Sequence, residues 1–206
     1  MTLTEIGTKF NTDKATYHRY TDFYDKLLSH LRDASINFLE IGILNGASLM
    51  MWNEYFSAAK IYGADINPYT HLDSSKVTTI VANQENEEDL LKLPDNLHVI
   101  LDDGGHTMLQ QQLTLKVMFK KLSSGGIYIL EDLHTSLPGF YSSYESNQYN
   151  NTIKLLKDLQ NKQLSEDSQY HITSDDFYEL LDQIESLEII ENSDQSITSV
   201  IKKRDH

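Results

Sequence analysis

The sequence contains no cysteine, only three prolines and one tryptophan, and few basic residues. Without cysteine, the chain forms no disulfide, no thiolate metal site and no cysteine nucleophile. The 17 lysines and arginines stand against 31 acidic residues, and the net charge of −14 excludes the basic surface that nucleic acid requires. No apolar run approaches the ~20 residues that cross a bilayer, and the N-terminus lacks the pattern of a secretory signal. We therefore expect a cytoplasmic protein that acts on a small molecule, with neither nucleic acid nor a membrane as partner.

The length and composition are typical of one globular domain. The chain has 206 residues, of which 39% are hydrophobic and 23% charged. No linker or repeat divides it, so we expect a single domain over residues 1–206. Its first 35 residues have helical periodicity. Residues 138–176, in which Pro138 and Gly139 are followed by several aromatic residues, are a candidate lid or acceptor-binding insertion.

Short apolar runs alternate with helix-compatible stretches, and this predicts an α/β fold. Helical spacing is clearest over residues 49–56 and 108–122. Two further runs near the C-terminus predict an antiparallel pair. The fold class that follows is Rossmann-like, with a mostly parallel seven-stranded sheet, an antiparallel C-terminal strand and helices on both faces. The expected strands are residues 36–41, 60–66, 77–82, 97–102, 126–131, 187–191 and 197–202.

A glycine-bearing turn after the first expected strand indicates a nucleoside site. Gly42 and Gly46 let the backbone turn tightly and approach a ligand, and Glu40 ends the strand before them. Asp65 ends the next strand, where a carboxylate accepts hydrogen bonds from ribose hydroxyls. The G-x-G-x-x-G spacing of dinucleotide sites is absent, which favours a ligand without a pyrophosphate, such as S-adenosylmethionine. The alternative is that both glycines are ordinary turn residues and that Asp65 caps the next helix.

Two further residues are assigned to the cofactor from their positions at strand ends. Asn83 and Gln84 follow the third expected strand and are placed at the adenine edge, with a plain surface loop as the alternative; Asn83 is the residue assigned to the cofactor. Asp102 ends the fourth expected strand and is placed with the same ligand, because ligands of open parallel sheets bind at this edge.

Acidic residues and histidines follow the fourth and fifth expected strands. If these strands are neighbours, Asp103, Glu131 and Asp132 converge, and three crowded carboxylates favour a hard cation such as Mg²⁺. His106 lies after a Gly-Gly pair and is our candidate general base for deprotonating a hydroxyl, with His134 as second choice. The alternative is that the carboxylates cap helices and that the histidines are ordinary surface residues.

Several of these blocks, taken in order, resemble the metal-dependent sugar O-methyltransferases of antibiotic pathways. That family includes the macrocin, mycinamicin and rhamnosyl enzymes and belongs to the class I S-adenosylmethionine-dependent methyltransferases. The resemblance covers residues 4–136 and fades after Pro138. It is carried by residues 7–9, 13–14, 18–20, 23–24, 39–42, 48–52, 55–56, 59–66, 102–106 and 131–136.

The resemblance implies S-adenosylmethionine at Glu40, Gly42 and Asp65. It also implies Mg²⁺ at the three carboxylates after the fourth and fifth strands and His106 as the base. Lys14, Tyr17 and Tyr20, in the N-terminal block, are candidates to cover the cofactor, with helix packing as the alternative. Where the family often has serine, this chain has Gly105, and we expect a looser turn there. The sequence does not include the long N-terminal region of the macrolide enzymes. We therefore do not expect their oligomer and acceptor contacts in this chain, and a homo-oligomer is one alternative.

The predicted function is therefore a Mg²⁺-assisted O-methyltransferase that methylates a hydroxyl of a sugar or glycosylated small molecule. One alternative is a catechol- or phenol-type O-methyltransferase of the same fold. Another is a non-catalytic S-adenosylmethionine-binding protein.

Overall fold

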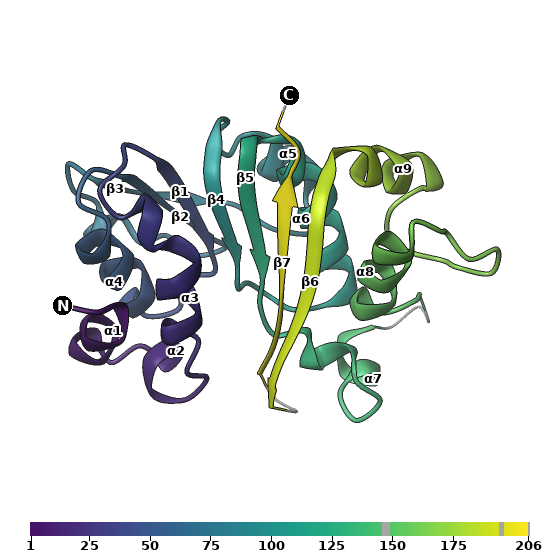
Figure 1. The fold of residues 1–206 in the computed structure, drawn as a ribbon, viewed down its shortest axis with the longest axis horizontal. Coiled ribbons are helices and arrows are strands. Elements are labelled where there is room, and N and C mark those ends of the chain that lie inside the picture. The colour runs from purple at the N-terminus through teal and green to yellow at the C-terminus, as the bar shows by residue number, and fades with distance from the viewer. Residues whose placement is uncertain (146–148, 194–195, 206) are drawn as a thin grey trace. The chain divides into compact units, whose positions relative to one another are not determined.

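The computed structural model describes residues 1–145, 149–193 and 196–205, which form two compact units. The first unit is Met1–Val81 and the second is Ala82–His206. Each unit contains its own strands and helices, labelled in Figure 1.

The strands of the first unit are parallel and lie in the order β3-β2-β1. In their registers Ile41 pairs with Ala64 and Asp65 pairs with Val81, so the carboxyl ends of the three strands meet at one edge. That edge carries the predicted nucleoside-binding residues. The strands are β1(Asn37–Ile41), β2(Lys60–Asp65) and β3(Val77–Val81).

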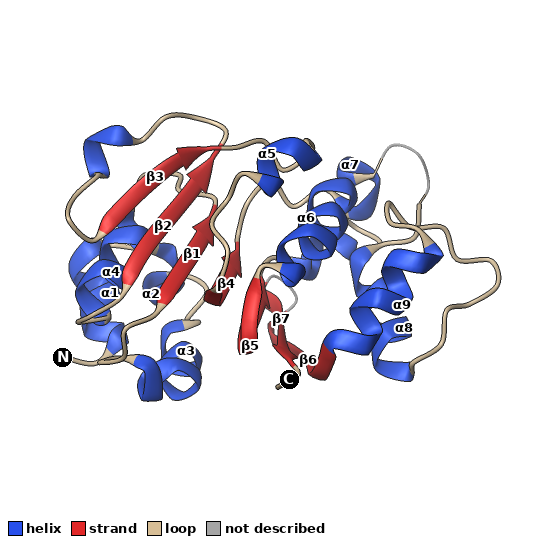
Figure 2. Cartoon of the chain, turned by 90° about the horizontal axis from the view of Figure 1, so that it is seen from above, coloured by secondary structure: helices blue, strands red, loops and turns tan. Residues whose placement is uncertain are grey.

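The main helices of the first unit cover one face of these strands (Figure 2). Trp52 lies at the centre of this layer, fully buried, with its ring 5.0 Å from that of Phe38 and 5.9 Å from those of Tyr24 and Phe56. It is therefore a core residue. The helices are α1(Leu3–Phe10), α2(Asp13–Thr16), α3(Thr21–Leu28) and α4(Ala47–Tyr55), with 3-10 turns η1(Ser29–Leu31) and η2(Thr70–Leu72).

The strands of the second unit lie in the order β4-β5-β7-β6, and β7 is antiparallel to both of its neighbours. β4 and β5 pair in parallel, with Asp102 opposite Leu130. The acidic residues that follow β4 and β5 therefore start from adjacent strand ends, which meets the condition on which the predicted carboxylate cluster depends. The strands are β4(Leu97–Asp102), β5(Leu122–Leu130), β6(Ile184–Ser193) and β7(Ser196–Lys203).

β5 begins four residues earlier than expected, because its first residues pair with β4 across an irregularity. Leu122 is opposite Leu97, but the next pair is Val99 with Ile127, so the intervening residues of β5 bulge. Gly125 takes a positive φ of 70° in this bulge, which the glycine permits without a β-carbon clash. Leu122, expected at the end of a helix, belongs instead to the strand.

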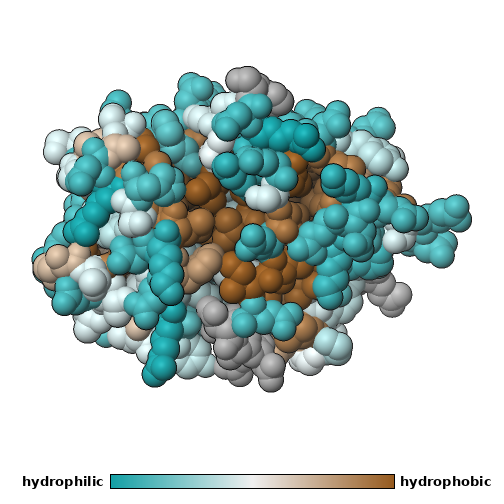
Figure 3. All heavy atoms as spheres, in the orientation of Figure 1, coloured by the Kyte–Doolittle hydropathy of each residue, from teal (hydrophilic) through white to brown (hydrophobic). Residues whose placement is uncertain are grey.

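Helices α6, α8 and α9 lie on one side of the strands of the second unit (Figure 2). α6 begins with a capping box between Thr107 and Gln110. On the other face of these strands, alternation places Ile129 beside Val200, and hydrophobic side chains gather over this region in Figure 3. The helices are α5(Glu87–Leu91), α6(Met108–Lys120), α7(Tyr141–Tyr144), α8(Thr152–Asn161) and α9(Ser174–Gln183), with the 3-10 helix η3(Leu133–Ser136).

The predicted fold class is confirmed in its strands. Across the described residues there are seven strands, mostly parallel, and the C-terminal strand β7 is antiparallel. The seven expected runs all coincide with observed strands, with ends that differ by a few residues. None of the helices in the described ranges is both long and apolar enough to cross a membrane.

Candidate functional site

The turn after β4 carries the first part of the candidate site. Asp103 directly follows the strand, and its side chain is partly exposed. Gly105 N donates to Gln84 Oε1 at 2.8 Å, while Gln84 Nε2 donates to Asp102 Oδ1 at 2.8 Å and to Thr114 Oγ1 at 3.2 Å. Gln84 is itself buried. One amide side chain therefore fixes both the end of the strand and the backbone of the turn.

The two glycines of this turn leave room for two glutamine side chains. A β-carbon on Gly104 would lie 1.9 Å from Gln84 Oε1, and one on Gly105 would lie 2.1 Å from Gln110 Oε1. Gln110 Oε1 in turn accepts a hydrogen bond from Thr107 N in the capping box of α6. Gly105 stands where the sugar O-methyltransferases often have serine. Because it has no β-carbon, it leaves room for Gln110 in the capping box of α6.

His106 and Asp132 are held in unusual backbone conformations. Their φ angles are 60° and 54°, in the left-handed region that side chains with a β-carbon rarely adopt. Asp132 directly precedes η3, and the buried Thr135 Oγ1 lies 3.1 Å from both His106 O and Asp132 O. Such conformations persist only where the surrounding structure stabilises them.

The two turns bring three predicted side chains together. His106 Nε2 lies 3.9 Å from Asp103 Oδ1 and 3.5 Å from Asp132 Oδ2. One ligand atom from each of the three residues lies within 4.8 Å of the other two. In the described part of the chain, nothing donates a hydrogen bond to Asp132 Oδ1, although this atom is buried. Two carboxylates and an imidazole at this spacing suit a divalent cation with a partly oxygen-based shell.

Glu131 and His134 flank this cluster. Glu131 is 1% exposed, and its backbone is tied to β4 by a 2.9 Å hydrogen bond from Glu131 N to Asp102 O. The structure does not include Glu131 in the set of mutually close ligand atoms. His134 Nδ1 lies 3.7 Å from Asp132 Oδ1, so the second candidate base approaches the same carboxylate from another direction.

Asp102, predicted to contact the cofactor, has its side chain in a buried network. Tyr128 Oη donates to Asp102 Oδ2 at 2.6 Å, opposite the bond from Gln84. Burial raises the pKa of Asp102 to about 7, although the hydrogen bonds from Tyr128 and Gln84 oppose the shift. The same burial, with Asp102 beside it, raises the pKa of Tyr128. Through Gln84, the Asp102 carboxyl group therefore helps to fix the turn that follows β4.

The first unit carries the glycine turn and the strand-end acid of the predicted cofactor site. Gly42 and Gly46 have positive φ angles of 92° and 81°. Asp65 Oδ2 accepts from Ile43 N at 2.9 Å, and Asp65 Oδ1 accepts from Asn67 N at 2.8 Å, so this carboxylate joins two turns at one strand edge. Glu40 is fully buried at the end of β1. The turn geometry predicted from the sequence is present.

The remaining cofactor candidates differ in their surroundings. Lys14 is 1% exposed and Tyr20 is fully buried, with the Tyr20 ring stacked on His18 at 5.3 Å. Asn83 is partly exposed in the second unit, and its Oδ1 accepts from Glu85 N at 3.0 Å. Their roles toward a cofactor stay predictions.

The comparisons with known proteins identify the family. The chain is 31% identical over 183 residues to demethylmacrocin O-methyltransferase of Streptomyces fradiae, which is 81% of this chain and 46% of the relative. It is also 31% identical over 154 residues to 8-demethyl-8-alpha-L-rhamnosyl tetracenomycin-C 2'-O-methyltransferase of Streptomyces olivaceus, covering 69% of this chain and 41% of the relative. The chain belongs to the macrocin, mycinamicin and rhamnosyl sugar O-methyltransferase family.

A solved structure of this sugar O-methyltransferase family matches the whole chain. The MycE methyltransferase of the mycinamycin biosynthetic pathway, in complex with Mg, SAH and mycinamycin VI, superposes with a TM-score of 0.81 at 25% identity. The match covers 100% of this chain and 54% of that protein, and it confirms the class I methyltransferase fold. The chain spans less than half the length of the curated relatives described above. No family model matches the sequence.

One aromatic side chain of the predicted lid region contacts a histidine that flanks the candidate metal centre. The ring of Phe140 contacts His134 edge-on at 5.2 Å. Further along, Glu145 Oε2 and His171 Nε2 are 2.5 Å apart, and both residues are partly buried. Gln112 Oε1 on α6 accepts a hydrogen bond from His171 N at 2.8 Å, which ties this region to α6. Lid function for residues 138–176 stays a prediction.

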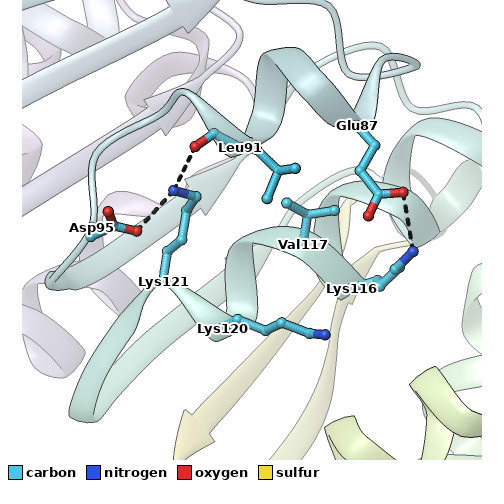
Figure 4. A pocket seen from close by; sticks show the side chains of 7 residues that line it. All are labelled: Glu87, Leu91, Asp95, Lys116, Val117, Lys120 and Lys121. Carbon is cyan, nitrogen blue, oxygen red and sulfur yellow. Dashed lines mark hydrogen bonds and ion pairs between the residues drawn. The ribbon is translucent and has the colours of Figure 1, made fainter.

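A separate cavity of about 250 Å³ lies between α5 and α6 (Figure 4). Three lysines line it, and each of them is ion-paired: Lys116 with Glu87, Lys120 with Glu179 and Lys121 with Asp95. With its positive charges neutralised, the cavity is not an anion site, and it contains none of the predicted functional residues.

Sequence reasoning missed three residues that shape the candidate metal centre. Gln84 was considered only for the adenine edge, and neither Thr135 nor Tyr128 was considered. Each acts on the centre through hydrogen bonds to residues 18 or more positions away. No local pattern marks such contacts, although Thr135 does lie within one of the blocks that carry the family resemblance.

Proposed function

We propose that the chain is an S-adenosylmethionine-dependent, Mg²⁺-assisted O-methyltransferase whose acceptor is a sugar hydroxyl of a glycosylated natural product. The observation that carries the proposal is the close grouping of Asp103, His106 and Asp132 in a chain of this family. The MycE relative, which contains both Mg and SAH, supports the same assignment. A cytoplasmic location stays a prediction of the sequence alone.

The donor set fits a magnesium ion. Asp103 and Asp132 offer hard carboxylate oxygens, and the buried Asp132 Oδ1 lacks a hydrogen-bond donor among the described residues. We assign Asp103, Glu131 and Asp132 as the ligands. A bound Mg²⁺ supplies Lewis acidity, which lowers the cost of deprotonating a coordinated hydroxyl.

The role of His106 follows from its position between two carboxylates. An imidazole that accepts the acceptor's proton becomes a cation, and Asp132 Oδ2 at 3.5 Å and Asp103 Oδ1 at 3.9 Å stabilise that charge. We therefore assign His106 as the general base that deprotonates the acceptor hydroxyl.

We assign the cofactor to the turn of the first unit. Gly42 and Gly46 give the backbone its close approach, and Glu40 and Asp65 are the strand-end carboxylates that accept hydrogen bonds from a ribose. Lys14 and Tyr20 complete the predicted set of this unit, whereas a cofactor role for Asn83 and Asp102 stays a prediction of the sequence. When bound, S-adenosylmethionine supplies an electrophilic methyl group on a sulfonium.

The test combines binding and turnover. Calorimetric titration of S-adenosylmethionine and, separately, of Mg²⁺ should show binding of both by the wild type. His106→Ala should retain Mg²⁺ binding and lose methyl transfer to a rhamnosylated acceptor by about 10²–10⁴-fold. His30→Ala, at an exposed histidine, is the control and should retain both.

Each contrary result changes a specific assignment. A wild type that binds no S-adenosylmethionine contradicts the methyltransferase proposal. Loss of Mg²⁺ binding in His106→Ala would make this residue a ligand and would leave the base unassigned. Turnover of catechols in preference to single sugar hydroxyls would favour the phenol-type alternative, and cofactor binding without any turnover would favour a binding protein.

A further inference from the structure

Thr135 lies inside η3 and is fully buried. It is not one of the three residues of the cluster, which are Asp103, His106 and Asp132. Its hydroxyl nevertheless lies between the two turns that carry these residues. A buried hydroxyl is found where it makes hydrogen bonds, so its acceptors indicate what it does.

The hydroxyl has two acceptors, one from each turn. Thr135 Oγ1 is 3.1 Å from His106 O, which is 29 residues away in sequence, and 3.1 Å from Asp132 O, which is three residues away. The single hydroxyl proton is therefore shared between carbonyls of two turns that start from different strands.

Both carbonyls belong to residues in the left-handed region of backbone space. His106 has φ 60° and Asp132 has φ 54°. A residue with a β-carbon stays in this region only when its surroundings hold it, because a return to a common conformation lowers its energy. Rotation of either peptide would move the attached side chain, and with it the His106 Nε2 to Asp132 Oδ2 spacing of 3.5 Å.

We propose that Thr135 is a positioning residue of the metal centre. Its hydroxyl holds the backbone of Asp132, a proposed ligand, in the conformation that binds a divalent cation, and it keeps the turn of His106, the proposed base, beside that ligand. This inference rests on the proposed function, because it presupposes that Asp132 is a Mg²⁺ ligand. The inference attributes the positioning of the metal centre to the Thr135 hydroxyl and not to the volume of the Thr135 side chain. Groups that orient the ligands of a metal site typically change metal affinity by about 10–100-fold when they are removed.

The test uses two substitutions at the same position and one elsewhere. Thr135→Val keeps the β-branched shape and removes the hydroxyl, whereas Thr135→Ser keeps the hydroxyl and removes a methyl group. Thr152→Val is the matched control, because Thr152 is also fully buried in the second unit and its hydroxyl contacts Met108 Sδ at 3.5 Å. Mg²⁺ affinity is measured by calorimetry and Mn²⁺ affinity by electron paramagnetic resonance, both without acceptor. Circular dichroism checks the fold of each variant.

We expect Thr135→Val to weaken binding of both ions by about 10–100-fold. Thr135→Ser should bind them within about threefold of the wild type, and Thr152→Val should match the wild type. Should Thr135→Val fail to fold, Thr135→Ala removes the same hydroxyl without a bulky group and is expected to show the same loss.

Three outcomes overturn the inference in distinguishable ways. If the wild type binds both ions and the hydroxyl-free variant binds them equally well, the role of Thr135 is wrong and the metal site stands. If the wild type binds neither ion, the proposed metal site is wrong, and the role of Thr135 that depends on it is wrong as well. Equal weakening in Thr135→Val and Thr135→Ser would assign the effect to packing and would also contradict the inference.

Discussion

Substitution of Gly104 by alanine should destabilise the protein through one neighbour, Gln84. The new β-carbon would lie 1.9 Å from Gln84 Oε1, 2.6 Å from its Cδ and 2.9 Å from its Nε2, so the side chain must move. Gln84 then loses its hydrogen bonds with Asp102, Gly105 and Thr114. One bond to a carboxyl group and two neutral bonds together contribute about 3 kcal/mol. For a chain of this size this corresponds to about 6–12 °C in melting temperature.

A double-mutant cycle tests whether the cost has this origin. In a Gln84→Ala background the same bonds are already absent and the space is empty, so Gly104→Ala should cost less than about 0.5 kcal/mol there. The coupling energy between the two substitutions is then about 3 kcal/mol, measured by urea unfolding with circular dichroism in the presence of a chelator. Hydrogen exchange at the amide of Gly105 should become faster in each single variant.

The control pairs Gly104→Ala with Gln110→Ala. Gln110 contacts the neighbouring Gly105 and not Gly104, so the two costs should add. Additive costs for Gly104→Ala and Gln84→Ala would refute the reasoning, because Gln84 would then not fill the space beside the turn.

Three further predictions concern charge and packing. Saturating Mg²⁺ at about 100 times its dissociation constant should stabilise the wild type by about 2.7 kcal/mol in thermal unfolding, and Asp132→Asn should abolish this shift; an equal shift in the variant would contradict the metal site. Burial raises the pKa of Asp102 to about 7, above its ordinary 3.8, so the folded chain retains a proton that the unfolded chain releases. Without metal, the free energy of unfolding should therefore fall by up to about 4 kcal/mol as pH rises from about 4 to about 7. Asp102→Asn should remove this decline. The same pH dependence of unfolding in the wild type and the variant would contradict this role of Asp102. Trp52→Ala should cost about 3–5 kcal/mol in urea unfolding, because the indole is fully buried among aromatic rings, and a cost below about 1 kcal/mol would show that Trp52 is not a core residue.

Much of the architecture was predictable because it depends on local order along the chain. Apolar runs of strand length, separated by helical periodicity, placed all seven strands. The start of β5 was missed, because the bulge before Ile127 results from pairing with β4 and has no periodic signal. The capping box of α6, by contrast, involves Thr107 and Gln110, which are only three positions apart in the sequence.

The sequence by itself determined which side chains follow which strand ends, and therefore that Asp103 and Asp132 would meet if β4 and β5 were neighbours. Only the tertiary structure decided that these strands pair, that His106 lies between the two carboxylates, and that Asp102 is buried against Tyr128. It also revealed Gln84 and Thr135, whose hydrogen bonds reach across 21 and 29 residues to the turn after β4. The physical reason is that strand and turn propensities act between near neighbours, whereas the geometry of a site is set by contacts between distant segments that meet only when the chain has folded.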